Sequence, residues 1–339
     1  MRRTKMIRKV GFLGLTAALL FSAVPAHAQK VLNISSWAPP THYTNAIVWT
    51  TWGKWIEEAT EGRVTTKIEY KLASPLKQFE LVRDGVADAA WIFHGYNTRY
   101  VATQAVEMPN LGTSAEAASV AYWRVHQKYL AKADEHKGVT LAGLSSHGPA
   151  VIQTKTPLTG LGDLKGLKIR VPGGVGSKVG KALGVVAVKL PAPKVYEALS
   201  SGVADGIFMP METQKSFRLK EVVPHVTIMP GGLYYGSFAY LLNTDFLNSL
   251  SEKDRQAILS VSGEKLTRLA GQTWDNADKT GLADAKASGS TVTTASAAVH
   301  AEYLELMAPV EADWVAQMNA AGIDGKAALA ELRSIARSY

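Results

Sequence analysis

Hydrophobic and polar positions follow the same order in two stretches of the chain, residues 79–92 and residues 196–209, which lie 117 residues apart. In both, an amphipathic run led by an aromatic residue stops at a glycine, Gly85 or Gly202, and an apolar run follows an aspartate. A glycine that accepts the left-handed conformation is a common helix end, and a short apolar run is typical of a buried strand. Gly-Val-Ala-Asp alone could recur by chance, but the flanking aromatic, glutamate and apolar positions recur as well. The pattern predicts two copies of a helix-to-strand corner, one in each of two similar lobes.

The residues just past the two corners are candidate binding residues. Each corner has the form of the αβ unit of a parallel sheet, and such sheets bind ligands beyond the carboxyl ends of their strands. We therefore expect Phe93 and His94, after the first corner, to face the same cleft as Phe208 and Met209, after the second.

The rest of the pattern predicts further strands and helices. Apolar or alternating runs predict strands at residues 31–37, 64–70, 139–144 and 150–154. We expect residues 145–149 to form the first crossing between the lobes. From the N-cap Ser251, helical periodicity continues to about Ala287, and an unbroken helix of ~35 residues would span ~50 Å and could brace both lobes. Other helices are predicted at residues 114–132, 302–318 and 325–338.

The N-terminal segment has the pattern of a secretory signal peptide. Five cations precede an apolar run, and Ala26-His27-Ala28 supplies the small residues of a cleavage site. The apolar run is shorter than the roughly 20 residues of a membrane-spanning helix, so we predict export with cleavage after Ala28. Without this segment the 37 basic residues fall to 32 against 29 acidic ones, and the net charge falls from +8 to +3. This balance gives no reason to expect nucleic acid or an anionic membrane as a partner.

Composition and spacing argue against catalysis and metal binding. The chain has no cysteine, which excludes disulfides, thiolate metal sites and a cysteine nucleophile. The histidines form no H-x-x-x-H pair, no G-x-S-x-G motif occurs, and the glycine-rich run at residues 173–180 fits neither glycine motif of nucleotide-binding loops. We expect no cofactor, no metal and no enzymatic activity, although residues that meet across two lobes could still form an active site.

Several motifs occur in a characteristic order: Asp163-Leu-Lys-Gly-Leu-Lys-Ile-Arg170-Val-Pro172, then Val195-Tyr-Glu-Ala-Leu199, then Gly202-Val-Ala-Asp-Gly206 with Pro210, and a Leu-Ser-Glu-Lys-Asp254 run before the long helix. The chain thereby resembles the periplasmic solute-binding proteins of tripartite ATP-independent periplasmic (TRAP) transporters of the DctP type. The resemblance extends over nearly the whole mature chain.

The resemblance implies an α/β class with the two-lobed periplasmic-binding-protein fold, in which helices flank mixed sheets and hinge strands and one long helix join the lobes. We place the signal peptide at residues 1–28, lobe I at residues 29–147 plus about 235–270, and lobe II at residues 148–234 plus about 271–339. The resemblance further implies a periplasmic receptor that closes on a small organic acid. It would deliver the acid to the subunits of a membrane permease driven by an ion gradient, and we expect the receptor to be a monomer.

The signature arginine of the family falls on Arg170. A guanidinium pairs bidentately with a carboxylate or sulfonate and stays protonated, which suits an anion-binding role. Ala150, Met209 and Phe93 stand where some relatives carry polar or charged ligand contacts. The resemblance therefore implies a smaller or more apolar ligand than a sugar acid.

Aromatic rings are the expected replacement for those contacts. Rings can sandwich an aromatic or branched acid, or can hold an ammonium group by cation–π attraction. A receptor for an amine or a zwitterion, a periplasmic enzyme and a ligand-sensing partner of a membrane signalling protein remain alternatives. The candidate ligand-binding residues are Arg170, Trp37, Phe93, His94, His147, Phe208, Met209, Tyr235 and Glu212.

Overall fold

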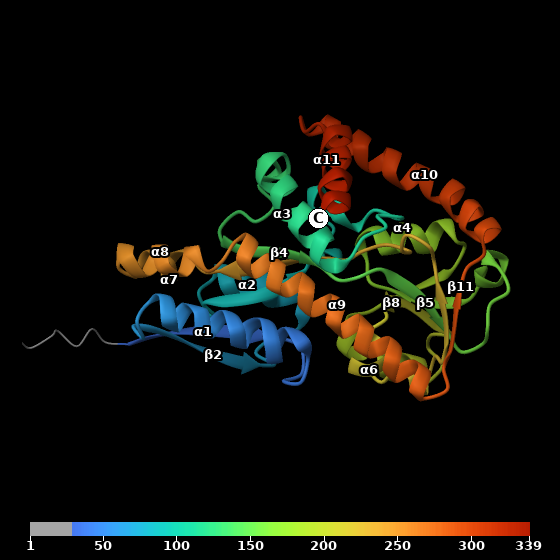
Figure 1. The fold of residues 1–339 in the computed structure, drawn as a ribbon, viewed down its shortest axis with the longest axis horizontal. Coiled ribbons are helices and arrows are strands. Elements are labelled where there is room, and N and C mark those ends of the chain that lie inside the picture. Colours follow the sequence, from blue (N-terminus) through green and yellow to red (C-terminus); the bar gives the residue numbers. More distant parts are fainter. Residues whose placement is uncertain (1–28) are drawn as a thin grey trace, which may run out of the picture.

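The computed structural model describes residues 29–339, and the predicted signal peptide at residues 1–28 lies outside the described residues. The chain forms two mixed β-sheets, each flanked by helices (Figure 1). This arrangement confirms the α/β class predicted from the sequence.

The first sheet has the strand order β2-β1-β3-β10-β4, in which β10 is antiparallel to both of its neighbours. Its strands are β1 (Lys30–Ser36), β2 (Val64–Tyr70), β3 (Ala89–Phe93), β4 (Thr140–Ser146) and β10 (Ser237–Leu242). The helices that follow or flank these strands are η1 (Thr44–Trp49), α1 (Thr50–Ala59), α2 (Gln78–Arg83), α3 (Ala115–Lys128) and α7 (Thr244–Asn248).

The second sheet has the order β11-β9-β5-β8-β6-β7, in which β5 is antiparallel to its neighbours. Its strands are β5 (Ala150–Thr154), β6 (Lys168–Val171), β7 (Val186–Lys189), β8 (Gly206–Pro210), β9 (His225–Ile228) and β11 (Thr291–Thr294). The helices α4 (Gly174–Ala182), α5 (Val195–Ser200) and α6 (Thr213–Ser216) belong to this half of the molecule.

The two predicted corners are confirmed as α2–β3 and α5–β8. Gly85 and Gly202 end the helical segments with φ angles of 70° and 78°, a conformation that favours glycine. The motif aspartates have matching roles, because Asp88 accepts a hydrogen bond from the Asn33 amide at 2.8 Å and Asp205 accepts one from the Lys168 amide at 3.0 Å. Each aspartate thus ties its corner to the neighbouring parallel strand.

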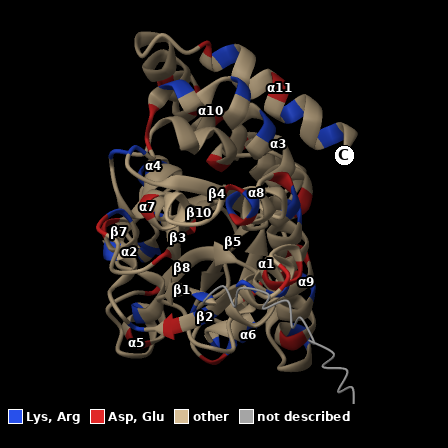
Figure 2. Ribbon diagram, turned by 90° about the vertical axis from the view of Figure 1, so that its left-hand side faces the viewer, with Lys and Arg blue, Asp and Glu red and all other residues tan. Residues whose placement is uncertain are grey.

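The central strands of both sheets are apolar and buried. Strands β3 and β10 of the first sheet and β5 and β8 of the second contain no Lys, Arg, Asp or Glu, and every residue in them is buried. Figure 2 shows the charged positions mainly along the outer helices and connecting segments. A charged side chain on a strand near the interior therefore stands out.

The chain crosses from one sheet to the other three times, once through α9 between β10 and β11, and twice through shorter segments, between β4 and β5 and between β9 and β10. The two shorter segments lie side by side, because the Ala150 amide donates to the Tyr234 carbonyl at 2.9 Å and the His147 amide donates to the Gly236 carbonyl at 3.2 Å. The expected crossing at residues 145–149 is confirmed, and the second crossing forms a paired hinge with it.

The prediction of a single long helix after Ser251 is wrong, because two helices occupy this stretch. Ser251 caps α8 (Glu252–Ser260), and α9 (Glu264–Ala287) starts after Gly263, which has φ 61° and donates its amide proton to the Ala142 carbonyl at 2.7 Å. This tertiary hydrogen bond breaks a pattern whose periodicity is otherwise continuous. The 24-residue α9 still braces the molecule, because it packs on α3 and β4 at one end and on α6 and β11 at the other (Figure 1).

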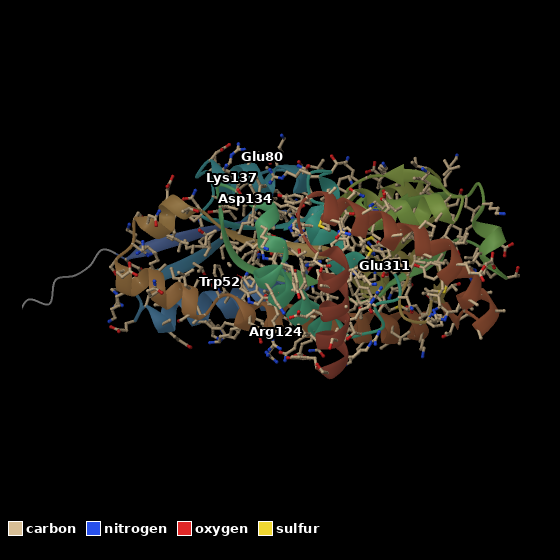
Figure 3. All side chains as sticks on the ribbon, turned by 90° about the horizontal axis from the view of Figure 1, so that it is seen from above. Trp52, Glu80, Arg124, Asp134, Lys137 and Glu311 are labelled. Carbon is tan, nitrogen blue, oxygen red and sulfur yellow. The ribbon has the colours of Figure 1, made fainter. Side chains whose placement is uncertain are left out.

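The chain ends in two helices, α10 (Ala297–Ala320) and α11 (Gly325–Ser338). Helix α10 contacts α4, whereas α11 contacts α3 beside the first sheet. Figure 3 marks Glu311 on α10, which pairs with Arg333 of α11 at 2.9 Å, and Arg124 on α3, which pairs with Glu264 of α9 at 2.8 Å. Among helices formed by residues 29–339, none is both long and apolar enough to cross a membrane.

Candidate functional site

A cavity lies between the two sheets, where β1, β3, β6 and β8 end, next to the hinge. Its walls surround about 440 Å³ of space, part of which is open to solvent. The lining residues are Trp37, His42, Trp91, Phe93, Tyr96, His147, Arg170, Pro172, Ala192, Met209, Pro210, Glu212, Phe217, Tyr234, Phe238 and Trp274. Both sheets and α9 therefore contribute to one site.

The first sheet supplies an aromatic wall. Trp91 and Phe93 share one face of β3, since side chains alternate along a strand, and both reach the cavity. The Trp37 ring stacks on Trp91 with centroids 4.3 Å apart, and its indole N–H donates to the Trp91 carbonyl at 3.2 Å. Phe238 of β10 continues the wall and stacks on Trp274 of α9 at 5.5 Å. The arrangement provides flat apolar surfaces that suit a ring.

Arg170 on β6 is the cation of the site. Its side chain lines the cavity, and the residue is only 2% exposed. Its Nε donates to the Leu190 carbonyl at 3.0 Å, but within residues 29–339 no carboxylate forms an ion pair with the guanidinium. A buried charge without a counter-ion is unfavourable, so a negative partner would stabilise the guanidinium in this environment.

Two histidines line the cavity in opposite tautomers. The Thr44 amide donates to Nδ1 of His42 at 3.2 Å, which leaves the proton of the neutral ring on Nε2. Nδ1 of His147 lies 2.6 Å from the Gly148 carbonyl, which can only accept, so this nitrogen carries the proton. Burial lowers the pKa of both rings to about 4. Both are therefore neutral near pH 7, and Arg170 is the one permanent cation among the lining residues.

Glu212 lies at the start of α6 and is 1% exposed. Ser216 donates its hydroxyl proton to Oε2, and the Glu212 amide donates to Oδ1 of Asp278 on α9 at 2.8 Å. Burial, with a smaller effect of the Asp278 charge, raises the pKa of Glu212 to about 8. The cavity thus contains a carboxyl group that is mostly protonated at neutral pH.

Six of the nine candidate residues predicted from the sequence line this cavity. They come from both sheets and from the hinge: Arg170, Trp37, Phe93, His147, Met209 and Glu212. The structure places them together, whereas their part in ligand binding stays a proposal.

The other three candidates do not line the cavity. His94 is buried behind the wall, where Nδ1 lies 3.1 Å from the Ser237 hydroxyl and Nε2 lies 2.8 Å from His136. Phe208 alternates with Met209 along β8, so its ring packs toward Gly180 of α4 instead. The Tyr235 side chain points away from the cavity, and its hydroxyl donates to the Thr113 carbonyl at 2.7 Å.

The prediction from sequence missed several lining residues that come from distant parts of the chain. Phe238 could not be placed without the strand register, which sets it opposite Phe93. Trp274 was visible only as part of a helical stripe. Among the missed residues are His42, Phe217, Tyr234, Phe238 and Trp274. In the part of the chain that the structure describes, no three His, Asp or Glu side chains are grouped to hold a metal ion.

Comparison with known proteins agrees with this architecture. Residues 34–317 match the family described as bacterial extracellular solute-binding protein, family 7 (DctP). A TRAP periplasmic solute-binding protein from Bordetella bronchiseptica, with bound (R)- and (S)-mandelate, is 39% identical with a TM-score of 0.89, over 91% of this chain and 99% of that one. A TRAP solute-binding protein from Rhodoferax ferrireducens, in complex with copurified benzoate, is 28% identical with a TM-score of 0.85, over 91% and 98% of the two chains.

A relative from Comamonas testosteroni, named outer membrane transporter protein TsaT, is 32% identical over 323 residues, which are 93% of this chain and 95% of that protein. The chain belongs to the DctP family of TRAP solute-binding proteins. The family consists of extracytoplasmic binding proteins for transport, and it confirms the resemblance drawn from the sequence motifs.

Proposed function

We propose that this protein is a periplasmic receptor for a small aromatic carboxylate, which it delivers to the membrane subunits of a TRAP permease. Arg170 would hold the carboxylate, and the rings of the first sheet would hold the aromatic body. Relatives with bound mandelate and benzoate support this ligand class. We further propose that the protein acts as a monomer in two lobes as assigned above, without a cofactor or metal, and binds its ligand without changing it chemically.

The observation that carries the proposal is the buried guanidinium of Arg170 in a cavity whose other walls are mainly rings. A carboxylate would supply the missing counter-charge through charge-assisted hydrogen bonds. Burial of the ligand ring would contribute about 25 cal/mol of favourable free energy for each Å² of apolar surface removed from water. Neither group alone would satisfy both parts of the cavity.

Closure of the two lobes on the ligand is the proposed working step. Lining residues come from both sheets, so a ligand that contacts both favours the closed form by its difference in affinity for the two forms. The paired crossings near Ala150 and Tyr234 supply the hinge, and the permease would recognise the closed form.

Isothermal titration calorimetry on residues 29–339 tests the ligand class. We expect benzoate and mandelate to bind more tightly than cyclohexanecarboxylate, which lacks the flat ring, and than succinate, which carries a second charge into an apolar wall. Nuclear magnetic resonance of the ligand before and after incubation should show no new compound.

The buried carboxyl of Glu212 makes an amine or zwitterion receptor the second candidate. Benzylamine in the same titration separates the two. Binding of benzylamine together with no binding of any aromatic acid would establish the amine receptor and remove our proposal, and turnover of a bound acid would establish an enzyme.

A further inference from the structure

Glu212 is a buried hydrogen-bonding group of the cavity that the carboxylate site does not use. It lines the cavity, and its Oε2 accepts a hydrogen bond from Ser216. Within residues 29–339, Oε1 has no hydrogen-bonding partner and no cation pairs with the carboxyl group. Oε1 does not belong to the fully buried polar atoms that lack a partner, so it is accessible and free to bond to a polar group of the ligand.

The segment that carries Glu212 is held rigidly. Its amide donates to Asp278, and the Thr213 hydroxyl donates to the Pro210 carbonyl at 2.7 Å. Gly281 of α9 packs directly on this segment, where a Cβ atom would lie 2.5 Å from the Glu212 Cα. With the backbone fixed from two directions and Oε2 held by Ser216, the free oxygen lies at a defined place, as a selective contact requires.

Glu212 and Arg170 provide two separate polar contacts. Arg170 lies on β6, and Glu212 follows the neighbouring strand β8. The two side chains form no ion pair with each other in the described chain. The Arg170 guanidinium donates to the Leu190 carbonyl, whereas the Glu212 carboxyl group accepts from Ser216. A ligand with its carboxylate on Arg170 can therefore present a second polar group to Glu212.

We propose that Glu212 hydrogen-bonds a hydroxyl group of the aromatic carboxylate that Arg170 holds, and so selects hydroxylated aromatic acids over unsubstituted ones. The inference rests on the proposed function, because Arg170 must fix the orientation of the ligand. A hydroxyl group can both donate and accept, so it pairs with a carboxyl group in either protonation state. An ammonium group would instead need an ionised Glu212, which burial and Asp278 disfavour.

The surroundings of Glu212 favour the neutral carboxyl group. Burial is the main cause that raises its pKa to about 8, and no neighbouring cation pairs with it among residues 29–339. The titratable or charged groups on the elements around it are Tyr43 and His42 before η1, Asp275, Asp278 and Asp284 on α9, Lys215 on α6, Lys220 paired with Asp284, and Arg170 across the cavity. Above pH 8 the ionised Glu212 would repel a bound anion.

Calorimetry with benzoate, 3-hydroxybenzoate, 4-hydroxybenzoate and 4-(aminomethyl)benzoate tests the proposal on the wild type, Glu212→Gln and Glu212→Leu. We expect the better hydroxybenzoate to bind roughly three- to tenfold more tightly than benzoate, as one hydrogen bond provides. Glu212→Gln should keep this preference and Glu212→Leu should lose it, measured in each variant as the ratio of hydroxybenzoate affinity to benzoate affinity. Glu221→Gln, on an exposed glutamate paired with Arg218, is the matched control and should change nothing.

A preference that persists in Glu212→Leu would overturn the proposal, as would tighter binding of 4-(aminomethyl)benzoate than of either hydroxybenzoate. If Glu212→Leu does not fold, the pH dependence decides: from about pH 7 to about pH 9 benzoate affinity should fall in the wild type and stay constant in Glu212→Gln, and equal behaviour would contradict us. Benzoate binding without a hydroxyl preference removes this inference alone, whereas no binding of any aromatic acid removes the proposed function with it.

Discussion

The two sheets meet at one cavity but contribute different chemistry to it. The first sheet supplies rings, chiefly Trp37, Trp91 and Phe93, and the second supplies the polar groups Arg170 and Glu212. Both sheets reach the cavity through the same helix-to-strand corner, with the same aspartate contact to the neighbouring strand. The difference teaches that the corner sets where each strand ends, whereas the few residues around that end set what each lobe recognises.

Side chains at equivalent positions of the two corners do not all point in the same direction. Trp91 lines the cavity, but its counterpart 117 residues later, Phe208, packs toward α4 while Met209 lines the cavity. The next pair of counterparts, Phe93 and Pro210, both line the cavity, so the two corners differ in which of the preceding residues face it. Similar sequence at the corners therefore gives similar backbones with different binding surfaces.

Removing the charge of the second sheet should have the largest effect. Arg170→Met deletes the proposed carboxylate partner, and loss of one member of a buried charge pair costs about 2–5 kcal/mol, so benzoate affinity should fall on the order of 30-fold or more. Calorimetry measures this loss. Lys168→Met, on the exposed lysine of the same strand, is the control, and unchanged affinity in Arg170→Met would show that the anion binds elsewhere.

A substitution that disturbs the packing of α9 on the Glu212 segment should have the second-largest effect. Gly281→Val places side-chain atoms against the Met211 carbonyl, because even a Cβ would lie 2.4 Å from that oxygen. We expect α9 to shift from the Glu212 segment and the free energy of unfolding to fall by about 1–3 kcal/mol, measured by denaturant titration. Asn276→Val, on the exposed side of the same helix, is the matched substitution; equal stability of the two variants would mean that this packing is not needed.

Weakening the ring wall of the first sheet should have a smaller and more selective effect. Trp37→Leu removes the ring stacked on Trp91, and aromatic contacts contribute about 0.5–1.5 kcal/mol beyond area, so affinity for benzoate should fall roughly two- to tenfold. Cyclohexanecarboxylate should lose less. Trp55→Leu changes a tryptophan on α1 away from the cavity and should leave both affinities intact. Equal losses for both ligands would mean that the wall recognises only apolar volume.

The smallest expected effect is on the pH dependence of stability. Burial raises the pKa of Asp278 to about 7, above its usual 3.8, so its contribution to stability is full at low pH and is lost as the pH rises through about 7. From about pH 4 to about pH 7, the melting temperature of the wild type should fall more than that of Asp278→Asn. The asparagine keeps an oxygen that accepts the hydrogen bond from the Glu212 amide.

Asp134→Asn makes the same substitution in an exposed turn with φ 50°, a conformation that asparagine accepts, and should follow the wild type. Parallel melting curves for the wild type and Asp278→Asn over the whole range would show that Asp278 does not titrate near pH 7.

Local features of the fold could be predicted from the sequence because local residues determine them. The alternating strand at residues 64–70 coincides with β2, and the glycines of both corners end their helical segments as expected. The break at Gly263 could not be predicted, because it depends on a hydrogen bond to Ala142, which lies in a strand far away in the chain.

The candidate site was predictable in part for the same reason. Arg170 belongs to a recognisable motif and Glu212 lies two residues after Pro210 of another, and both line the cavity. The side chain of His94 turns behind the wall to pair with His136, and His42 enters the cavity from a loop after β1. Those placements depend on which long-range partners each residue finds, which no local pattern records.

A crystal structure of residues 29–339 with bound benzoate tests the central claim most directly. We predict both carboxylate oxygens within hydrogen-bonding distance of the Arg170 guanidinium and the ring against Trp91 and Phe238. A benzoate whose carboxylate points away from Arg170, or one bound outside this cavity, would contradict the account.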